Sequence, residues 1–586
     1  MRQWMAAAKK ADFYAIAEKF HVDPVVARII RNREVIGEKN IRIYLGGNLS
    51  DLSDPHQMKD MGRLVEILAQ KIRKQVHIRI IGDYDVDGVT SSHLFLTALR
   101  RVGAKVDVVI PHRIQDGYGL SLHLLQQAKE DGVDTILTCD NGIAAIDEIA
   151  WAKAQKMTVL VTDHHAVPFE EHEGRRTEKK SLADAVVNPH QQDCGYPYKE
   201  LCGAGVAWNV IRVLYENYDM DKREAEDLLD FVAMATVCDV MSLTGENRIL
   251  VKEGLKRIRH TKNIGLQALM QACNVQPENI SAYHFGYVLG PCVNATGRLD
   301  TARHALRLFE TGQETEAEEI ARDLVDLNQE RKELTLQGVE MAKKLCEEGG
   351  YENDPVLVLF LPDVHESIAG LIAGRIREMY NRPVFVLTRG EEGVKGSGRS
   401  TENYSMYENM CGCAELFTKF GGHPMAAGLS LPEENVEKFR RKINENCPLT
   451  VEEVCPDIHI DMAMPVGYAS TELVHQFALL EPFGKDNPSP LFADRNLSIS
   501  RMWVIGKNRN VLRMSVLSEY GQPVPVIFFG DVETLFAYFT EKFGQEEVEN
   551  ALHGRKNRIL FSMVYTAKID FYQGNENLQL EMKYYR

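Results

Sequence analysis

Closely spaced carboxylates are the first feature of this chain that could do chemistry. The segment 82–88 reads Gly-Asp-Tyr-Asp-Val-Asp-Gly, so Asp83, Asp85 and Asp87 occupy alternate positions directly after an apolar run. One aspartate in this place could simply cap a helix. Three of them could not be buried together without cations, because mutual repulsion and lost hydration would cost too much free energy. The segment therefore predicts bound metal.

Three other apolar segments also end in candidate ligands. Asp140 ends the first and Asp239 follows the second. The third ends in Asp163, His164 and His165. A single histidine at a strand end is more often a hydrogen-bonding residue than a ligand, but two adjacent histidines after an aspartate are more informative. A carboxylate at a helix C-terminus is disfavoured by the helix dipole, and a metal ion would remove that penalty at Asp239.

The donor atoms favour particular metals. Carboxylate oxygens with one or two imidazoles suit Mn²⁺ or Mg²⁺ better than zinc or copper. Enough ligands exist for two ions roughly 3.5–4 Å apart, which hold the attacking and leaving oxygens in phosphoester hydrolysis. Such ions also lower the pKa of a shared water, so no nucleophilic serine or cysteine is required. The predicted metal ligands are Asp83, Asp85, Asp87, Asp140, His164 and Asp239. The predicted catalytic group adds His165 to this set.

The elements that must position these residues alternate along the chain. Short β-branched runs, which predict strands, occupy 76–81, 105–110, 134–139, 157–162 and 183–187. Helical periodicity occupies 120–130 and 143–156, and a further helix is expected from about Val89. This alternation predicts a parallel sheet covered by helices on both faces. Sites in such sheets lie at the carboxyl ends of the strands, where the polar residues collect.

The rest of the chain predicts further domains. The expected organisation is a helical region at 1–70, a catalytic α/β domain at 71–312, a connecting helix at 313–350, a second α/β domain at 351–450 and a small β-barrel at 456–586. The connecting segment is charged and almost free of glycine, and a spacer role is preferred over a catalytic one. The fold class is therefore α/β, with two α/β domains joined by a long helix and a C-terminal barrel.

Composition sets the broad class. Hydrophobic residues make up 44% and charged residues 26% of the chain, as in ordinary globular proteins. No apolar run approaches the roughly 18–20 residues of a membrane span. The first 20 residues resemble an amphipathic helix more than a signal peptide, so the expected localisation is cytoplasmic. The 11 cysteines form no CxxC pair, which predicts free thiols.

Phosphate binding requires local positive charge, although the net charge is −16. Arg113, Arg298 and Arg399 each lie in a glycine-containing segment. Glycine lets the backbone approach a phosphate, and guanidinium offers a bidentate fork. For any one of these arginines alone, a surface ion pair would be the simpler interpretation. A basic groove on an acidic surface is compatible with the net charge.

The barrel region also combines cations with aromatic rings. Its candidate strands hold Trp503, Phe528 and Phe529, and the nearby cations are Arg501, Lys507, Arg509 and Arg513. Stacking rings next to cations suit single-stranded nucleic acid. The competing interpretation is that the rings belong to the core, and this interpretation is favoured for Phe528.

The ordered acidic and histidine motifs resemble the four-motif signature of the DHH phosphoesterases. The remaining motifs are similar to the RecJ family within this superfamily, and they are PHRIQDGYGL (111–120), VNATGRL (293–299), IAGLIAGR (368–375) with Arg382-Pro383, GSGRS (396–400) and FGGHPMAAGLS (420–430). The segment 481–492 resembles the start of the OB-fold that follows the DHHA1 domain in that family. The resemblance covers nearly the whole chain and identifies the two α/β domains as DHH and DHHA1 domains.

The resemblance implies a function that the residue patterns do not. It implies a metal-dependent 5′-to-3′ exonuclease that converts single-stranded DNA to nucleoside 5′-monophosphates in DNA repair and recombination. Arg113, Ser397 and Arg399 would bind the 5′-terminal phosphate, while Arg298 and His423 would hold the scissile phosphate or its neighbour. The implied substrate-binding residues are Arg113, Asn294, Arg298, Ser397, Arg399 and His423. The chain is expected to be a monomer that does not bind a membrane. A single-stranded-DNA-binding protein and a helicase are its candidate partners.

Two small departures and two alternatives remain. Thr296 and the Ser367-Ile368 step differ from the usual family residues, which affects substrate preference more than chemistry. One alternative is a DHH enzyme for short oligoribonucleotides or cyclic dinucleotides, which would not need the N-terminal region or the barrel. The other is an inactive scaffold, which would be expected to lack some of the carboxylates.

Overall fold

The computed structural model describes residues 3–586 except 114, 115, 118, 173, 174, 391, 392, 507–509 and 573. The chain forms two compact units. The first comprises Leu52–Met241 and Ile249–Pro456, and the second comprises Gln3–Asp51, Ser242–Arg248 and Asp457–Arg586. Among the described residues, no helix combines the length and apolarity that a membrane crossing demands.

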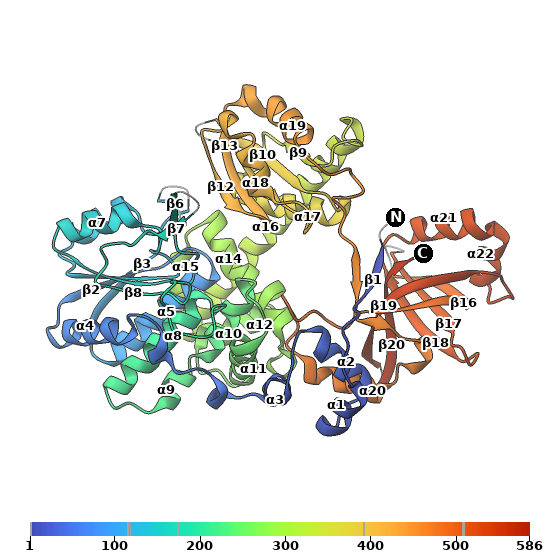
Figure 1. The fold of residues 1–586 in the computed structure, drawn as a ribbon, viewed down its shortest axis with the longest axis horizontal. Helices are drawn as coiled ribbons and strands as arrows, with labels where there is room; N and C mark the ends of the chain where they lie inside the picture. The colour runs from blue at the N-terminus through green and yellow to red at the C-terminus, as the bar shows by residue number, and fades with distance from the viewer. Residues whose placement is uncertain are drawn as a thin grey trace. The chain divides into compact units, whose positions relative to one another are not determined.

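A five-stranded parallel sheet forms the centre of the catalytic domain (Figure 1). Its strands, in spatial order, are β3 (Lys105–Val109), β2 (His77–Ile81), β4 (Thr135–Cys139), β5 (Thr158–Thr162) and β8 (Ala185–Val187). One face packs against α4 (Met61–Arg73), α5 (Val86–Arg101) and α8 (Gly203–Asn217). The other face packs against α6 (Leu122–Glu130) and α7 (Ile146–Ala154). The predicted parallel sheet with helices on both faces is confirmed.

Helix α5 begins earlier than the sequence pattern indicates. The expected start was near Val89, but the first helical residue is Val86. Asp85 is the N-cap, and its side chain accepts a hydrogen bond from the Gly88 amide at 3.0 Å. A Cβ atom at Gly88 would lie 2.4 Å from the Asp83 carbonyl oxygen, so only glycine fits there. The capped turn therefore folds the acidic segment tightly at the end of β2.

A mainly helical layer follows the sheet in the same unit. Its helices are α9 (Lys222–Glu226), α10 (Leu229–Cys238), α12 (Ile264–Ala272), α13 (Ala282–His284), the π-helical turn η4 (Phe285–Leu289), α14 (Gly290–Leu299) and α15 (Ala302–Glu310). Helix α11 runs from Gly245 to Ile258. The predicted connecting helix is α16 (Glu314–Glu348), which has 35 residues. Helices α12, α14 and α17 (Ala369–Tyr380) all pack against α16.

The DHHA1 region contains a mixed five-stranded sheet. Its order is β12 (Lys419–His423), β13 (Ala426–Leu431), β11 (Gly393–Arg399), β10 (Val384–Gly390) and β9 (Leu357–Phe360). Only the pairing between β9 and β10 is parallel. One face covers a core with α16 and α17, and the other covers a core with α18 (Met406–Cys411) and α19 (Val436–Glu445).

The second unit contains the predicted barrel. Its ring of strands is β16 (Phe492–Ile505), β17 (Val511–Leu517), β18 (Pro523–Phe529), β20 (Asn575–Tyr585) and β19 (Leu560–Tyr572), which pairs again with β16. Helices α21 (Val532–Phe543) and α22 (Gln545–Leu552) connect β18 to β19. This closed five-stranded ring has the strand order of an OB-fold.

The N-terminal helices belong to the core of the barrel unit. These helices are α1 (Phe13–Phe20), α2 (Pro24–Asn32) and α3 (Glu38–Gly46). Buried residues of α2, such as Val26 and Ile30, share one apolar cluster with α20 (Thr471–Phe477) and the barrel interior. Strand β1 (Trp4–Ala6) also pairs in parallel with β14 (Ile458–Ile460). Residues far apart in sequence therefore complete a single core.

Candidate metal centre and phosphate pocket

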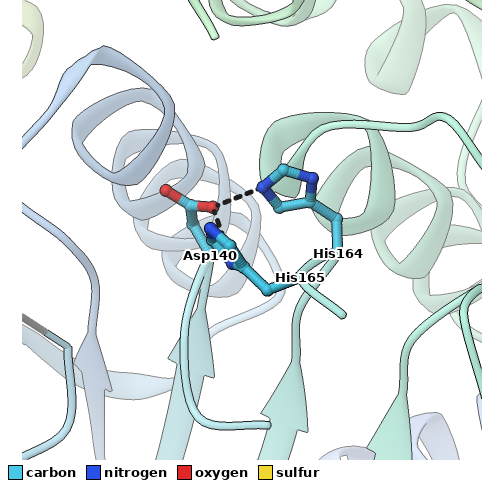
Figure 2. A group of neighbouring side chains, drawn as sticks. All are labelled: Asp140, His164 and His165. Atoms are coloured by element: carbon cyan, nitrogen blue, oxygen red, sulfur yellow. Dashed lines mark ion pairs between the residues drawn. The ribbon is translucent and has the colours of Figure 1, made fainter. Parts of the chain in front are cut away.

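The predicted ligands meet at the carboxyl edge of three neighbouring strands. Asp83 follows β2, Asp140 follows β4 and His164 follows β5. Asp239 reaches the same place as the C-cap of α10. His164 Nε2 lies 3.1 Å from Asp140 Oδ1, 3.6 Å from Asp239 Oδ2 and 3.7 Å from Asp87 Oδ2. In Figure 2 both imidazoles turn toward the Asp140 carboxylate.

The donor atoms form overlapping groups that could each hold a cation. Within each group, all of the donor atoms lie within 4.8 Å of one another. The groups are Asp83–Asp85–Asp140, Asp140–His164–His165 and Asp87–His164–Asp239. Asp140 is shared by the first two groups and His164 by the last two. This sharing is the arrangement expected for two adjacent ions with bridging ligands.

The electrostatics of the cluster fit a bound cation. Asp83 is 1% exposed and Asp140 is 2% exposed. Burial and nearby aspartates raise the pKa of both carboxyls well above the ordinary value. Burial lowers the pKa of His164, which favours the neutral imidazole that a metal requires. Asp83 Oδ2 and His164 Nε2 are buried without a hydrogen-bond partner among the described residues. Divalent cations would satisfy these atoms and neutralise the clustered charge.

Asp163 holds His164 and His165 in place through hydrogen bonds. Its carboxylate accepts hydrogen bonds from the His164 amide at 2.7 Å, the Ile143 amide at 2.9 Å and His165 Nδ1 at 2.7 Å. Burial disfavours the charged forms of both Asp163 and His165. The hydrogen bond between them nevertheless lowers the pKa of Asp163 and raises the pKa of His165 to about 9. Asp163 therefore orients His165, as carboxylates behind metal-binding histidines commonly do.

Asp87 is fixed by the start of α8. Its two carboxylate oxygens accept hydrogen bonds from the Gly203 amide at 2.6 Å and the Ala204 amide at 2.7 Å. The two bonds fix the position of the Asp87 carboxylate at the N-terminus of α8, where negative charge is stabilised. A Cβ atom at Gly203 would lie 2.6 Å from Asp140 Cβ, which leaves room only for glycine. Sequence reasoning missed Gly203 because it lies 116 residues after Asp87.

Asp140 also has an unusual backbone. Its φ of 61° lies in the left-handed region, which residues other than glycine seldom adopt. Such conformations persist where the surrounding structure holds them, often at functional sites. Here the turn directs the Asp140 carboxylate toward both histidines, as Figure 2 shows.

A cationic pocket adjoins the metal ligands. Its volume is about 490 Å³. Three of its lining residues, Tyr84, Arg113 and Arg298, come from the DHH domain. Residues of the DHHA1 region complete the lining, among them Gly370, Ser397, Arg399 and Lys419. Because Tyr84 lies between Asp83 and Asp85 in the chain, the pocket borders the metal cluster.

The pocket arginines are crowded and partly desolvated. Burial, together with Arg113, Arg331 and Arg399, lowers the pKa of Arg298 to about 10. Burial and nearby arginines also lower the pKa of Arg399. Arg298 Nη1 donates to the Ser367 carbonyl at 2.6 Å, and Arg399 Nη1 donates to Ser397 Oγ at 3.2 Å. A buried cluster of like charges favours an anionic ligand.

The first turn of α17 shapes the same pocket. A Cβ atom at Gly370 would lie 2.7 Å from Ser397 Oγ and 2.8 Å from Arg399 Nη2. Glycine at this position therefore keeps the space in front of the two groups open. The helix N-terminus adds a favourable environment for an anion. The sequence motif 368–375 includes Gly370, but its spacing did not reveal this role.

Two predicted substrate-binding residues occupy different environments. Asn294 Oδ1 accepts a hydrogen bond from the Val86 amide at 3.2 Å, which ties α14 to the acidic segment. His423 is exposed at the end of β12. The described lining of the pocket includes Lys419 and Phe420 from this strand but not His423. A contact between His423 and substrate therefore stays a prediction.

The outer face of the barrel presents the predicted rings. Trp503 is 38% exposed, and the Arg501 guanidinium lies 5.7 Å from its ring centroid. Arg513 pairs with Trp503 across the strands, and Phe529 is 57% exposed. Phe528 is buried in the core, as expected. Among the residues singled out from sequence, Ile114, Gln115, Tyr118, Lys507 and Arg509 lie outside the described residues.

Comparisons with known proteins agree with this architecture. The model for the DHH family N-terminal domain matches residues 77–236, the DHHA1 domain model matches 353–447 and the RecJ OB domain model matches 460–584. The single-stranded-DNA-specific exonuclease RecJ of Haemophilus influenzae is 32% identical over 582 residues, which cover 96% of each chain. This chain belongs to the RecJ family.

Other RecJ proteins extend the comparison. The single-stranded-DNA-specific exonuclease RecJ of Bacillus subtilis is 33% identical over a segment that covers 87% of this chain. The same segment covers 63% of that relative's length. The crystal structure of RecJ from Thermus thermophilus in complex with Mn²⁺ superposes with a TM-score of 0.81 at 25% identity. The match covers 100% of this chain and 79% of the Thermus chain. The RecJ fold, including the OB domain, is therefore confirmed.

Proposed function

We propose that this chain is a metal-dependent exonuclease that degrades single-stranded DNA from the 5′ end and releases nucleoside 5′-monophosphates. The activity on single strands and the use of Mn²⁺ or Mg²⁺ follow from membership of the RecJ family. The polarity and the product are supported by one observation, the cationic pocket that borders the metal ligands. A role in DNA repair and recombination fits the family.

The residues of the chain have distinct tasks in this reaction. The carboxylates of the cluster and His164 would hold two ions, which supply Lewis acidity and an activated water when bound. Asp163 keeps the His165 ring oriented, and the first amides of α8 hold the Asp87 carboxylate in place. Arg298 would hold a phosphate of the strand at the border between the pocket and the metal ligands.

The pocket would determine where the strand is cut. A terminal phosphate held by Arg113, Ser397 and Arg399 fixes the position of the strand end. The phosphodiester next to that end is then presented to the metal ligands. Each cycle would release one nucleotide and leave a new 5′ phosphate for the next cycle. A DHH enzyme for short oligomers is a weaker alternative, because the RecJ OB domain is present.

The polarity can be tested with one DNA strand labelled at either end and digested in Mn²⁺. The 5′ label should appear at once in mononucleotide, while the 3′ label should pass through a ladder of shortening strands. A matched RNA strand measures sugar selectivity in the same assay. Early release of the 3′ label, or internal cutting, would exclude the proposed polarity.

The barrel is proposed to bind the strand without taking part in the chemistry. Replacing both Trp503 and Phe529 by alanine should raise KM for long single-stranded DNA roughly tenfold, because base stacking contributes about 1–3 kcal/mol per base. Cleavage of very short oligonucleotides should be unchanged. Tyr14→Ala, which removes a ring that is 78% exposed on α1, is the control.

Substitution tests this role better than truncation does. Removal of residues beyond Cys455 would expose the apolar cluster that α1–α3 share with the barrel. Equal KM values for the double variant and the wild type on long strands would show that this face of the barrel does not bind DNA.

The oligomeric state and the protein partners are also proposals. We infer that the chain acts as a monomer, and that a single-stranded-DNA-binding protein and a helicase work with it. The enzyme consumes single strands, so a reaction that separates duplex DNA must precede it.

A further inference from the structure

Two tyrosines project from the helix that leads to the metal centre. Helix α13, the π-helical turn η4 and α14 follow one another without a break from Ala282 to Leu299. Tyr283 is 61% exposed and Tyr287 is 71% exposed. Their rings stack on each other, with centroids 5.1 Å apart and planes 22° apart. We refer to these two residues as the tyrosine pair.

The turn that carries the tyrosine pair is anchored beside a metal ligand. Cys238 Sγ donates a hydrogen bond to the Phe285 carbonyl oxygen at 3.3 Å. A Cβ atom at Gly286 would lie 3.4 Å from a methyl carbon of Val237. Both contacts are at the end of α10, directly before Asp239. The π-helical turn therefore lies against the element that supplies this ligand, and such turns often occur at functional sites.

The same continuous run of helix connects the tyrosine pair with the phosphate-binding residues. Asn294 and Arg298 lie one turn apart in α14, on the same side of that helix. Arg298 lines the cationic pocket, and Asn294 contacts the Val86 amide of the acidic segment. Tyr287 precedes Asn294 by about 10 Å along the axis, at about 1.5 Å per residue. The order along the helix axis is therefore pocket, metal motif and tyrosine pair.

We propose that Tyr283 and Tyr287 stack on bases of the DNA strand on the 3′ side of the bond that is cut. This inference rests on the proposed function, which places the 5′ end in the cationic pocket and the scissile phosphate at the metal ligands. The strand must then leave the metal centre on the side opposite the pocket. The tyrosine pair lies on that side.

Stacking would serve the reaction in two ways. It would position the strand while the terminal nucleotide is cut, and it would do so for every sequence, because each base offers a planar face. It would also favour single strands, because paired bases in a duplex are already stacked on their neighbours. The tyrosine pair would thus contribute to specificity close to the chemistry, as distinct from the barrel in the second unit.

Within the described part of the chain, no packing role explains rings in this position. Both side chains are mainly exposed, so neither fills a core, and they make their ring contacts with each other and with His284. A protein partner could also cover exposed tyrosines. The test therefore uses purified enzyme and DNA alone, in which a partner-binding surface would have no effect.

The first measurement compares KM and kcat for the Tyr283→Ala/Tyr287→Ala double variant with those of the wild type. On a long single strand, KM should rise about fivefold to a hundredfold, since one or two stacked bases are lost. The kcat should change little. Tyr287→Phe keeps the ring and should behave as the wild type, and Tyr14→Ala controls for loss of an exposed tyrosine.

The second measurement locates the contact along the strand. A series of substrates carries one abasic nucleotide at successive positions from the 5′ end. In the wild type, an abasic nucleotide at one or two of these positions should raise KM as much as the double substitution does on an intact strand. In the double variant, those positions should show no further rise.

The outcomes separate this inference from the proposed function. Failure of the wild type to digest single strands from the 5′ end would overturn the proposed function itself. Normal digestion by the wild type, with an unchanged KM in the double variant, would overturn only the role of the tyrosine pair. An abasic nucleotide that raises KM equally in the wild type and the double variant would also overturn that role. A rise in KM for Tyr287→Phe as large as that for the double alanine variant would show that the hydroxyl group, and not the ring, makes the contact.

Discussion

The Asp140→Asn variant should lose at least roughly a thousandfold in kcat on single-stranded DNA, because Asp140 belongs to two of the overlapping ligand groups. Asparagine has nearly the same size but lacks the negative charge that bridging two cations requires. The metal-free variant should fold normally, and its thermal midpoint should equal or exceed that of the metal-free wild type. Removal of one buried charge relieves the repulsion that raises the pKa of this carboxyl.

Combined substitutions should distinguish one shared site from independent contributions. His164→Ala alone should be as inactive as Asp140→Asn, and the double variant should be no worse than either, because one metal centre needs both residues. Asp193→Asn, on an exposed ion pair with Lys59, is the matched control and should retain activity. Near-normal turnover in either single variant, or a double variant tenfold worse than each single one, would contradict a common centre.

A 5′-phosphorylated strand should be cut at least about tenfold more efficiently than a 5′-hydroxyl strand of the same sequence. Each charge-assisted hydrogen bond to the terminal phosphate contributes roughly 1.5–3 kcal/mol, and tenfold in efficiency corresponds to about 1.4 kcal/mol. The pocket offers Arg113, Ser397 and Arg399 for these bonds. A hydroxyl end would leave a buried group of cations without its anion.

Arg399→Ala tests this pocket directly. The variant should cut both strands slowly, with little discrimination between them left. Arg441→Ala, which removes an exposed arginine from α19, should keep the full ratio. Gly370→Ala should also lower the cutting rate and the discrimination between the two strands, because its methyl group would collide with the Ser397 and Arg399 side chains. Equal rates for the two strands in the wild type would remove the pocket from the mechanism and leave the metal chemistry untouched.

The metal centre was largely predictable because its ligands follow short apolar runs. Each predicted strand of the first sheet is present within one or two residues of its expected bounds, and their carboxyl ends meet at one edge. Proximity of Asp83, Asp140 and His164 then follows from parallel pairing alone. The predicted start of α5 near Val89 was too late, because capping by an aspartate was considered but set aside in favour of metal binding, whereas Asp85 caps the helix.

The supporting contacts could not be predicted in the same way. The bonds from Gly203 and Ala204 to Asp87 depend on how α8 packs against α5, which no local pattern specifies. The space in front of Arg399 depends on Gly370, which is 29 residues earlier and on another element. Such contacts arise from tertiary packing of segments that are individually unremarkable in sequence.

Which segments make up the second unit could not be predicted from the sequence either. The sequence predicts a helical region at 1–70, yet residues 3–51 share a core with the barrel. Arg248, which lies next to the DHH domain in sequence, donates to the carbonyl oxygens of Tyr44, Leu479 and Leu480 in this unit. A buried arginine that donates to backbone carbonyl oxygens has no sequence signature, because every residue provides such an acceptor.

The most direct test of the metal centre is a titration of the metal-free chain with Mn²⁺, followed by electron paramagnetic resonance and by single-turnover digestion of DNA. The account predicts two bound Mn²⁺ per wild-type chain with a spin-coupled signal, and hydrolysis that appears as the pair forms. Asp140→Asn should lose the coupled signal together with hydrolysis. Binding of a single uncoupled ion, or undiminished digestion after complete removal of metal, would contradict the proposed two-metal chemistry.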